Sequence, residues 1–529
     1  MLFNSYIFIF AFLPVTLLGF YLIQNRGHHS FSIFWLVAAS LFFYGWWNPA
    51  YLGLLVFSTI FNFIIGIHLG KNSNNASLNK IILIIGVATN LSILGYFKYA
   101  NFFIDNLNAV TDNNLILNEI ILPLGISFFT FQQISYLVDA YYNETREYSF
   151  LHYCLFVTFF PQLIAGPIVH HKEILPQFIR TTVNTLKSKN IAIGLTIFCL
   201  GLFKKVILAD GISIYASPIF DAAEAGVAIT FFEAWSGALA YTFQLYFDFS
   251  GYSDMAIGLA RMFGIRLPIN FNSPYKATNI SDFWKRWHIT LSRLIRDYLW
   301  DPVSLSLTRF AINKEYGVIR IYILTVIIPI IFSFFWIGLW HGAGWNFIIF
   351  GFMHGFYIVF FNLWSKSKAK FFNFSIFENS KFSLLMGWSI TFICVVFGWV
   401  LFRAESFEGA QIIINAMISF DEIVLPQNIH MIKHWFSNEI FINGLYDSNF
   451  KAAIWILLLL FISLALPNTL QIMKKYKPAL ESYIGEIVSS RNNYLQWRPI
   501  KTWALFTAVI FVLSILNISG ESEFLYFQF

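Results

Sequence analysis

His341 has the residue type and surroundings expected of a buried catalytic base. It lies in the run from Ile321 to Trp364, which contains no Asp, Glu, Lys or Arg. Ionisable groups inside apolar segments are costly and often serve function. Flanking glycines allow close backbone approach, and Trp340 and Trp345 offer a stiff apolar wall. A neutral imidazole in this setting can act as a general base toward a hydroxyl. The alternative is a histidine at a helix–helix contact or a membrane interface.

A second histidine, His288, lies in the aromatic and basic stretch from Asp282 to Ser292. Its residues recur at helical spacing, which predicts an amphipathic helix at the cytoplasmic boundary. The basic residues of this stretch and its continuation, called the basic surface below, are Lys285, Arg286, Arg293 and Arg296. They can donate to the phosphates of a coenzyme, or they can anchor lipid headgroups. No glycine-rich phosphate loop of either common type is present.

A polar island interrupts the apolar stretch around Tyr246 to Asp254. Asp248, Ser250 and Asp254 are candidates for the lining of a wet tunnel. Internal hydrogen bonding that joins two helices explains them equally well. The sequence alone does not separate these alternatives.

Other common chemistries lack support. No nucleophile-elbow pattern places a serine on a strand-to-helix turn, so a hydrolase triad is not indicated. Cys154, Cys199 and Cys394 lie in or beside apolar segments without paired spacing, which supports neither a disulfide framework nor a metal site. His354 follows His341 on what would be another level of a straight helix, and packing is its expected role.

The elements that must position these residues are membrane helices. Charged residues are 12% of the chain and hydrophobic residues 57%, against roughly a quarter charged in a soluble domain. The charge-free runs are Met1 to Asn25, Gly27 to Gly70, Ile81 to Phe97, Ile120 to Val138, Ile321 to Trp364, Phe382 to Phe402, Ala452 to Met473 and Thr502 to Gly520. Several can hold two spans, so we predict an all-α polytopic membrane protein with about eleven transmembrane or re-entrant segments.

The net charge of +6 does not indicate nucleic acid, because the basic residues form short clusters between apolar segments. Placed in the cytoplasm by the positive-inside bias, these clusters put both chain termini on the extracytoplasmic side of the membrane. The first apolar segment has no basic residue before it and is expected to be a retained span. Lys204 and Lys205 fit this zigzag poorly, which suggests a re-entrant element around residues 150 to 210.

The chain is expected to form a single membrane domain, residues 1–529, with no soluble domain of useful size. Its parts are a core at 1–403, an extracytoplasmic loop at 404–451, and C-terminal helices with an aromatic tail at 452–529. The moderately polar loop is predicted to form a small extracytoplasmic cap.

Several motifs together resemble the membrane-bound O-acyltransferase family. They are the Asp282 to Ser292 block, the Trp340-His341-Gly342 block, the Pro161 to Pro167 turn, Leu122 to Phe129, and Tyr246 to Asp254. The resemblance covers most of residues 1 to 403. Within the family, the pattern of motifs is similar to that of the bacterial polysaccharide branch. It implies tilted helices around a central funnel and tunnel, with the family's catalytic histidine at His341 and its second functional histidine at His288.

The chain ends in Phe524-Leu525-Tyr526-Phe527-Gln528-Phe529. Physically this is an aromatic anchor with one acylable hydroxyl, on Tyr526; alternatives are an ordinary aromatic belt residue or a remnant of a protease tag. In related polysaccharide acetylation systems the membrane subunit ends in a similar Phe-x-Tyr-x-x-Phe pattern. The D-alanylation branch carries it on a separate small protein, so the resemblance favours acetylation.

The resemblance implies an acyltransferase of the cytoplasmic, or inner, membrane of bacteria. Acetyl-CoA is the expected donor, with its phosphates on the basic surface and no permanently bound cofactor. His341 is the expected base, His288 positions or polarises the donor, and Tyr526 receives the acetyl group. A separate extracytoplasmic transferase would then pass the group to a polysaccharide. D-alanyl transfer to teichoic acid is the runner-up, and a transporter of an acylated carrier is the alternative of another class.

Overall fold

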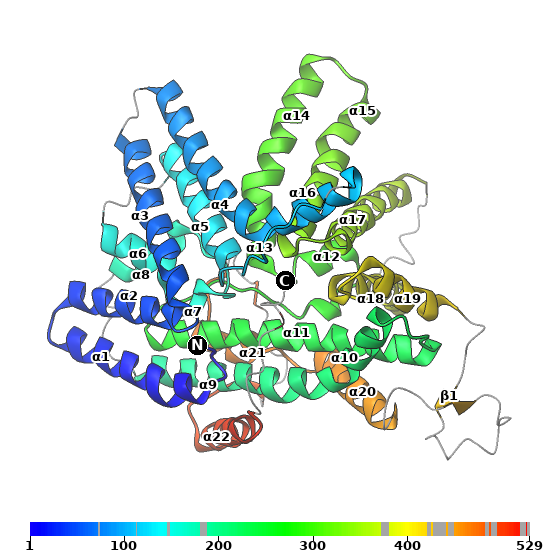
Figure 1. The fold of residues 1–529 in the computed structure, drawn as a ribbon. Coiled ribbons are helices and arrows are strands. Elements are labelled where there is room, and N and C mark those ends of the chain that lie inside the picture. Colours follow the sequence, from blue (N-terminus) through cyan, green and yellow to red (C-terminus); the bar gives the residue numbers. More distant parts are fainter. Residues whose placement is uncertain are drawn as a thin grey trace. The chain divides into compact units, whose positions relative to one another are not determined.

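The computed structural model describes residues 1–71, 75–112, 114–144, 149–179, 188–371, 380–419, 425–426, 441–442, 449–481, 486–487, 495–518 and 525. The chain, drawn in Figure 1 with colours that follow the sequence, divides into two compact units that interleave along the sequence. Unit 1 comprises Met1–Phe203, Ser250–Ile269 and Thr469–Gln528, and unit 2 comprises Lys204–Phe249 and Asn270–Asn468. The long helix α11 (Phe231–Met262) contributes its first part to unit 2 and its second part to unit 1. The expected single domain, with its core, loop and tail, stays a prediction.

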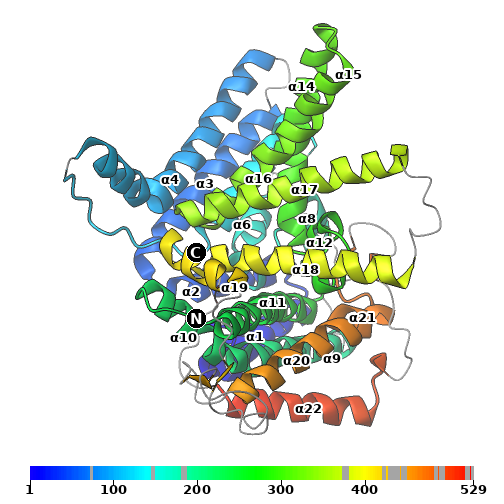
Figure 2. The ribbon, with the colours of Figure 1, turned by 90° about the vertical axis from the view of Figure 1, so that its right-hand side faces the viewer.

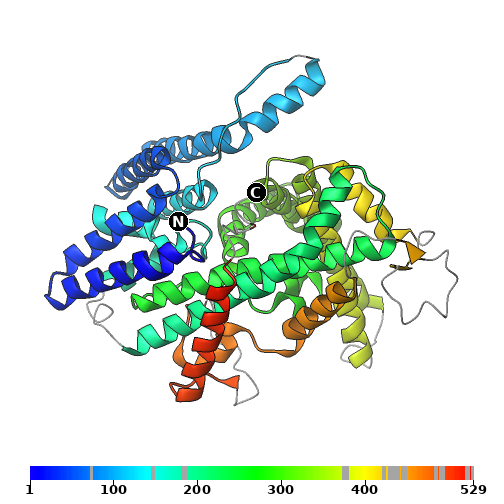
Figure 3. The same ribbon diagram turned by 60° about the horizontal axis from the view of Figure 1, so that its bottom comes forward.

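Unit 1 is helical in its described residues. Its helices are η1 (Phe8–Phe12), α1 (Leu13–Asn25), α2 (His29–Gly45), α3 (Pro49–Lys71), α4 (Ala76–Thr111), α5 (Ile126–Tyr141), α6 (Phe150–Thr158), α7 (Phe160–Leu163), α8 (His171–Ile179), α9 (Ser188–Phe203), α21 (Thr469–Met473), η9 (Lys474–Tyr476) and α22 (Lys501–Leu516). Figure 3 shows α22, in red, lying against α9.

Buried polar pairs and close glycine contacts join the helices of unit 1. Asn62 of α3 and Asn90 of α4 exchange side-chain hydrogen bonds of 3.1 and 2.6 Å. Gly194 of α9 packs on Gly258 of α11 so closely that an added Cβ would lie 2.5 Å from the Gly258 carbonyl oxygen. Small residues and interhelical amides are what membrane helices use to associate, since lipid offers no hydrophobic drive between them.

Unit 2 contains the predicted histidines. Its elements besides α11 are η3 (Lys204–Ala209), α10 (Asp210–Glu224), η4 (Pro274–Lys276), α12 (Ile280–Trp284), α13 (Ile289–Ile295), η5 (Arg296–Trp300), α14 (Asp301–Asn313), α15 (Val318–Tyr322), η6 (Ile323–Ile327), α16 (Ile328–His341), α17 (Trp345–Phe371), α18 (Lys381–Arg403), α19 (Phe407–Ile418), β1 (Leu425–Pro426), β2 (Phe441–Ile442) and α20 (Asn449–Ala465). The two-residue strands β1 and β2 pair in parallel.

An antiparallel hairpin of α16 and α17 carries His341. Figure 2 shows these helices beside α18. At the crossing, a Cβ on Gly338 would lie 2.2 Å from the Phe347 carbonyl oxygen and 3.1 Å from the Cα of Gly351. Glycine is therefore needed at Gly338 for the backbones to approach this closely.

Seven helices among the described residues are long and apolar enough to cross a membrane, and an eighth is added when the bent pair Phe450–Ala465 and Thr469–Tyr476 is taken as one span. The seven are Phe8–Asn25, Pro49–Leu69, Ala76–Thr111, Ser188–Glu224, Val318–His341, Trp345–Ser367 and Lys381–Arg403. The Ile321 to Trp364 run is one of those that hold two candidate spans, which are Val318–His341 and Trp345–Ser367. The predicted number of about eleven is not confirmed by this criterion.

The expected re-entrant element around residues 150 to 210 needs correction in its second half. Residues 150–179 form the short helices α6, α7 and α8, whereas Ser188–Glu224 is a continuous candidate span. Lys205 interrupts the apolar pattern there without marking a loop, because it is buried in an ion pair inside the protein.

Candidate active site

His341 is the last residue of α16, at the start of the turn into α17. The helix ends there because Gly342 adopts an extended conformation. The imidazole is buried and packs edge-on against Phe402 of α18, with ring centroids 4.9 Å apart, and against Phe350 of α17, at 6.2 Å. The hairpin and α18 together hold His341 in an aromatic setting.

His288 lies at a break between helices. Its φ of 42° is left-handed, and it precedes the first residue of α13, whereas α12 has already ended at Trp284. The single amphipathic helix expected over this block is therefore wrong. Trp284 and Trp287 are buried rather than facing lipid. These residues and His288 would share one face of a straight helix, so the left-handed backbone of His288, and not their burial, marks the break.

The Trp340 indole lies between the two histidines. Its ring centroid is 5.8 Å from that of His288 and 4.9 Å from that of His341. Phe249 of α11 packs edge-on against the other side of the site, 4.9 Å from the His288 ring. Trp345, the other expected wall residue, is 57% exposed and does not share this buried setting.

The His288 ring contacts Asn270 and is fully buried. The Asn270 side-chain oxygen lies 2.9 Å from His288 Nδ1 and accepts a further hydrogen bond of 3.0 Å from the Thr290 hydroxyl. Burial lowers the pKa of His288 to about 3, because desolvation penalises the imidazolium. The imidazole is therefore neutral at physiological pH.

Two arginines of the basic surface form ion pairs, and a further cation that the sequence did not indicate, Lys276, lies near them. Arg286 pairs with Asp282 at 2.9 Å, and Arg296 pairs with Asp297 at 3.0 Å, while Lys285 is exposed. Burial, and then the positive charge of Arg286, lower the pKa of Lys276. Cations are thus close enough here to oppose one another, and an anion would relieve that repulsion.

A buried ion pair holds the first part of α11 in unit 2. Lys205 Nζ lies 2.6 Å from Asp248 and 2.9 Å from Asp210, and the side chains of Lys205 and Asp248 are each only 2% exposed. Because Phe249 follows Asp248 directly, this ion pair fixes the helix segment that packs against His288.

The other tunnel candidates lie in unit 1. Asp254 accepts a 2.6 Å hydrogen bond from the hydroxyl of Thr469, the first residue of α21, as expected for side chains that join helices. Ser250 is buried in α11. A tunnel lined by Asp248, Ser250 and Asp254 stays a prediction. Tyr526 lies outside the described residues.

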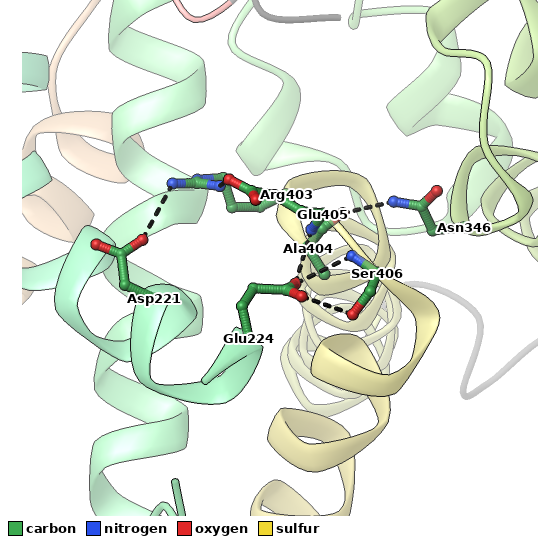
Figure 4. A network of polar contacts seen from close by, with 7 residues as sticks. All are labelled: Asp221, Glu224, Asn346, Arg403, Ala404, Glu405 and Ser406. Carbon is green, nitrogen blue, oxygen red and sulfur yellow. Dashed lines mark hydrogen bonds and ion pairs between the residues drawn. The ribbon is translucent and has the colours of Figure 1, made fainter. Parts of the chain in front are cut away.

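A network of polar contacts in unit 2 joins the end of α10, the start of α17, the end of α18 and the start of α19 (Figure 4). The Glu224 carboxylate accepts hydrogen bonds from the Glu405 and Ser406 amides, at 2.8 and 3.1 Å, and from the Ser406 hydroxyl, at 2.6 Å. Ser406 caps α19, where a carboxylate also favours the helix dipole. Asn346 donates to the Ala404 carbonyl and so joins the start of α17 to the end of α18.

Arg403 extends this network at the end of α18. Its guanidinium lies 3.9 Å from Asp221 and 4.0 Å from Glu405. The residue before it, Phe402, packs on His341. The network thus fixes the helix ends that surround the candidate base.

The residues from 126 to 402 match the sequence model of the membrane-bound O-acyltransferase family. This range contains both histidines, Asn270 and the basic surface. The chain is also 39% identical to the peptidoglycan O-acetyltransferase of Helicobacter pylori, an alignment that covers 100% of this chain and 98% of the relative. The chain belongs to the membrane-bound O-acyltransferase family. It is a multi-pass membrane protein and an acyltransferase.

Two further relatives of this O-acyltransferase differ in their distance from it. The probable alginate O-acetylase AlgI of Pseudomonas putida is 36% identical over 100% of both chains. The teichoic acid D-alanyltransferase of Bacillus subtilis is 28% identical over 54% of this chain and 69% of its own length. The similarity to the O-acetylating relatives therefore extends over the whole chain, and the similarity to the D-alanylating relative over part of it.

An apolar cavity of about 660 Å³ lies apart from the histidines in unit 2. It is bounded by α17, α18 and the start of α12, with Tyr357, Phe361, Met386 and Ile390 in its walls. Neither His288 nor His341 lines it, so the chemistry of the O-acyltransferase is not assigned to this cavity. His354 packs in an aromatic cluster and accepts a 3.3 Å hydrogen bond from Trp284, consistent with the structural role expected for it.

Sequence reasoning missed Asn270, Lys205 and Lys276 as parts of this site. Asn270 stands in Pro268-Ile269-Asn270-Phe271, where no charge or periodicity distinguishes it. Lys205 was visible as a misfit in the topology, and its buried partners Asp210 and Asp248 give the reason. Lys276 carries no distinguishing local pattern.

Proposed function

We propose that this O-acyltransferase takes an acetyl group from acetyl-CoA at the cytoplasmic face of the bacterial inner membrane. The group serves O-acetylation of a cell-surface or exported polysaccharide. The observation that carries this assignment is the buried pair His288 and His341, which contact one Trp340 indole within the region matched by the family. The full-length similarity to O-acetylating relatives favours acetyl over D-alanyl transfer.

His341 acts as the general base. The oxygen of the accepting hydroxyl attacks the thioester carbonyl carbon while its proton moves to the imidazole. The carbon–sulfur bond then breaks, and the CoA thiolate takes the proton back from the imidazolium. No net proton is consumed, so the histidine is ready for another cycle.

The basic surface binds the donor. Acetyl-CoA carries several phosphate charges, and Lys285, Arg286, Arg293 and Arg296 are donors that suit them. Lys276 is close enough to Arg286 for the arginine charge to lower its pKa. Lys276 therefore adds to the same positive potential. His288 positions the donor beside His341.

The acetyl group leaves on Tyr526. The C-terminus is assigned to the extracytoplasmic side, as is the N-terminus. A separate extracytoplasmic transferase then collects the acetyl group for the polysaccharide.

Replacing His341 with Ala tests the assignment in cells. A host that lacks its own copy of the protein is complemented, and ester-linked acetate on the isolated polysaccharide is measured. We expect a loss of at least about 100-fold, the usual worth of general base catalysis. His28→Ala is the matched control, since His28 is an exposed histidine of unit 1. Normal acetylation by His341→Ala protein present in the membrane at the wild-type level would contradict the assignment.

Tyr526→Phe tests the relay separately, because it removes only the hydroxyl. We expect polysaccharide acetylation to be lost in cells. Tyr6→Phe is the control for the loss of a phenolic hydroxyl outside the proposed site. Full acetylation by Tyr526→Phe would remove Tyr526 from the pathway and leave the role of His341 in place.

A further inference from the structure

Asn270 contacts the His288 segment at several points. Its side-chain oxygen meets His288 Nδ1 at 2.9 Å and the Thr290 hydroxyl at 3.0 Å. Its backbone carbonyl accepts a 3.0 Å hydrogen bond from the Ile289 amide. Asn270 and His288 are each 0% exposed, and Thr290 is 1% exposed. These contacts join two parts of unit 2 that lie eighteen residues apart in the sequence.

The backbone of His288 needs this support. A histidine with φ of 42° is in the left-handed region, which is unfavourable for a non-glycine residue and persists where its surroundings impose it. The hydrogen bonds that Asn270 makes with the His288 ring, the Ile289 amide and the Thr290 hydroxyl hold the turn. The same turn separates α12 from α13 and directs the imidazole inward.

The chemistry of the amide oxygen determines the tautomer. A side-chain amide oxygen accepts hydrogen bonds and cannot donate them. The ring nitrogen that faces it must therefore carry a hydrogen, and that nitrogen is Nδ1. The Thr290 hydroxyl donates to the same oxygen, which is therefore the shared acceptor of the two side chains.

We infer that Asn270 is a positioning residue that fixes His288 as the Nδ1–H tautomer, which makes Nε2 the atom that accepts hydrogen bonds from the substrates. This inference deepens the proposed function and rests on it for the identity of those substrates. A neutral imidazole with its hydrogen on Nδ1 has only a lone pair at Nε2. It cannot polarise a thioester carbonyl, which would need a donor.

His288 therefore orients a substrate group that donates a hydrogen bond to Nε2. The accepting hydroxyl and the amide N–H groups of the pantetheine arm both have this chemistry. His341 remains the residue that removes the proton. The walls that Phe249 and Trp340 form around His288 exclude water and strengthen such a hydrogen bond.

Nitrogen-15 NMR of histidine-labelled full-length protein in lipid reads the tautomer directly. The His288 signals are assigned by their absence in His288→Gln. We expect wild-type protein without substrate to show a protonated Nδ1 and an unprotonated Nε2. Asn270→Ala and Asn270→Ser should shift His288 toward the Nε2–H form, whereas Asn270→Asp should keep the hydrogen on Nδ1. An Nε2–H tautomer in the wild type, or one unchanged by Asn270→Ala, would overturn the inference.

Release of CoA from acetyl-CoA provides the second readout. Asn270→Ala should slow it by about 10- to 100-fold, as loss of the residue that orients a histidine does at metal sites. Asn270→Asp should restore more of the rate than Asn270→Ser, because a carboxylate keeps the acceptor. Asn272→Ala, on the same loop with its side chain against Asn468, is the matched control.

The two readouts separate this inference from the proposed function. If wild-type protein released no CoA but showed the Asn270-dependent tautomer, acetyl transfer would fail and the role of Asn270 would stand. Should Asn270→Ala not fold, Thr290→Val supplies the test, since it removes one donor to the amide and keeps the side-chain shape. We expect Thr290→Val to mix the tautomers, and a pure Nδ1–H signal with an unchanged rate would contradict the role of the shared amide oxygen.

Discussion

Burial of His288 links the active site to the stability of the protein. Because the pKa of His288 is lowered from 6.5 to about 3 by desolvation, the folded protein keeps this imidazole neutral in mild acid. The unfolded chain takes up a proton there below about pH 6.5. The unfolded state then binds more protons, so the free energy of unfolding falls as pH falls, by at most about 1.4 kcal/mol per pH unit.

Thermal unfolding in detergent between about pH 7 and pH 5 checks this sign. We expect wild-type protein to lose stability on acidification and His288→Gln to lose less. His28→Gln is the control for an exposed histidine. Equal pH dependence in wild type and His288→Gln would show that His288 is not held neutral by burial.

At the scale of elements, an ion pair fixes α11 beside the site. Lys205→Met leaves Asp248 buried without its partner, which typically costs about 3–5 kcal/mol. We expect a large drop in the thermal midpoint in detergent. Adding Asp248→Asn should recover most of it, because removing both charges avoids the uncompensated one. If Lys205→Met were as stable as wild type, the ion pair would not hold these helices together.

The hairpin of α16 and α17 depends on Gly338. A methyl group there would lie 2.2 Å from the Phe347 carbonyl oxygen, so Gly338→Ala must part the helices and displace His341 at the end of α16. We expect a loss of about 1–3 kcal/mol in stability, as for other overpacked contacts, with reduced CoA release.

Gly95→Ala is the matched control for the hairpin. Gly95 lies within α4 with nothing near its added Cβ, so alanine there should be neutral or stabilise by up to about 1 kcal/mol. Equal stability and activity in the two alanine variants would show that close approach at Gly338 is not required.

Hydropathy predicted the elements where apolar runs were uninterrupted, and failed where buried charges compensate one another. The spans of α16, α17 and α18 follow from runs without charge. Ser188–Glu224 was missed as a span because Lys205 and Asp210 interrupt its pattern. Their pairing with each other and with Asp248 is a tertiary fact, and a local pattern does not contain it.

At the scale of the whole molecule, local patterns predicted part of the candidate site, and tertiary contacts determine the rest. His341 was found from a histidine flanked by glycine and tryptophan in an apolar run, and family resemblance singled out His288. Helical spacing wrongly predicted one amphipathic helix around His288, because local periodicity cannot register the left-handed turn that Asn270 supports. Trp345 shares the sequence motif with His341 but is exposed, since the chain turns between them.

The central claim is that the protein is an enzyme that breaks the acetyl-CoA thioester, with His341 as the base. Its most direct test is the release of free CoA from labelled acetyl-CoA by purified full-length protein in lipid, in the presence of the accepting partner. We predict release by wild-type and His28→Ala protein, and a decrease of at least about 100-fold in His341→Ala. Absence of release by wild-type protein, as expected of a transporter, or release at the wild-type rate by His341→Ala, would contradict it.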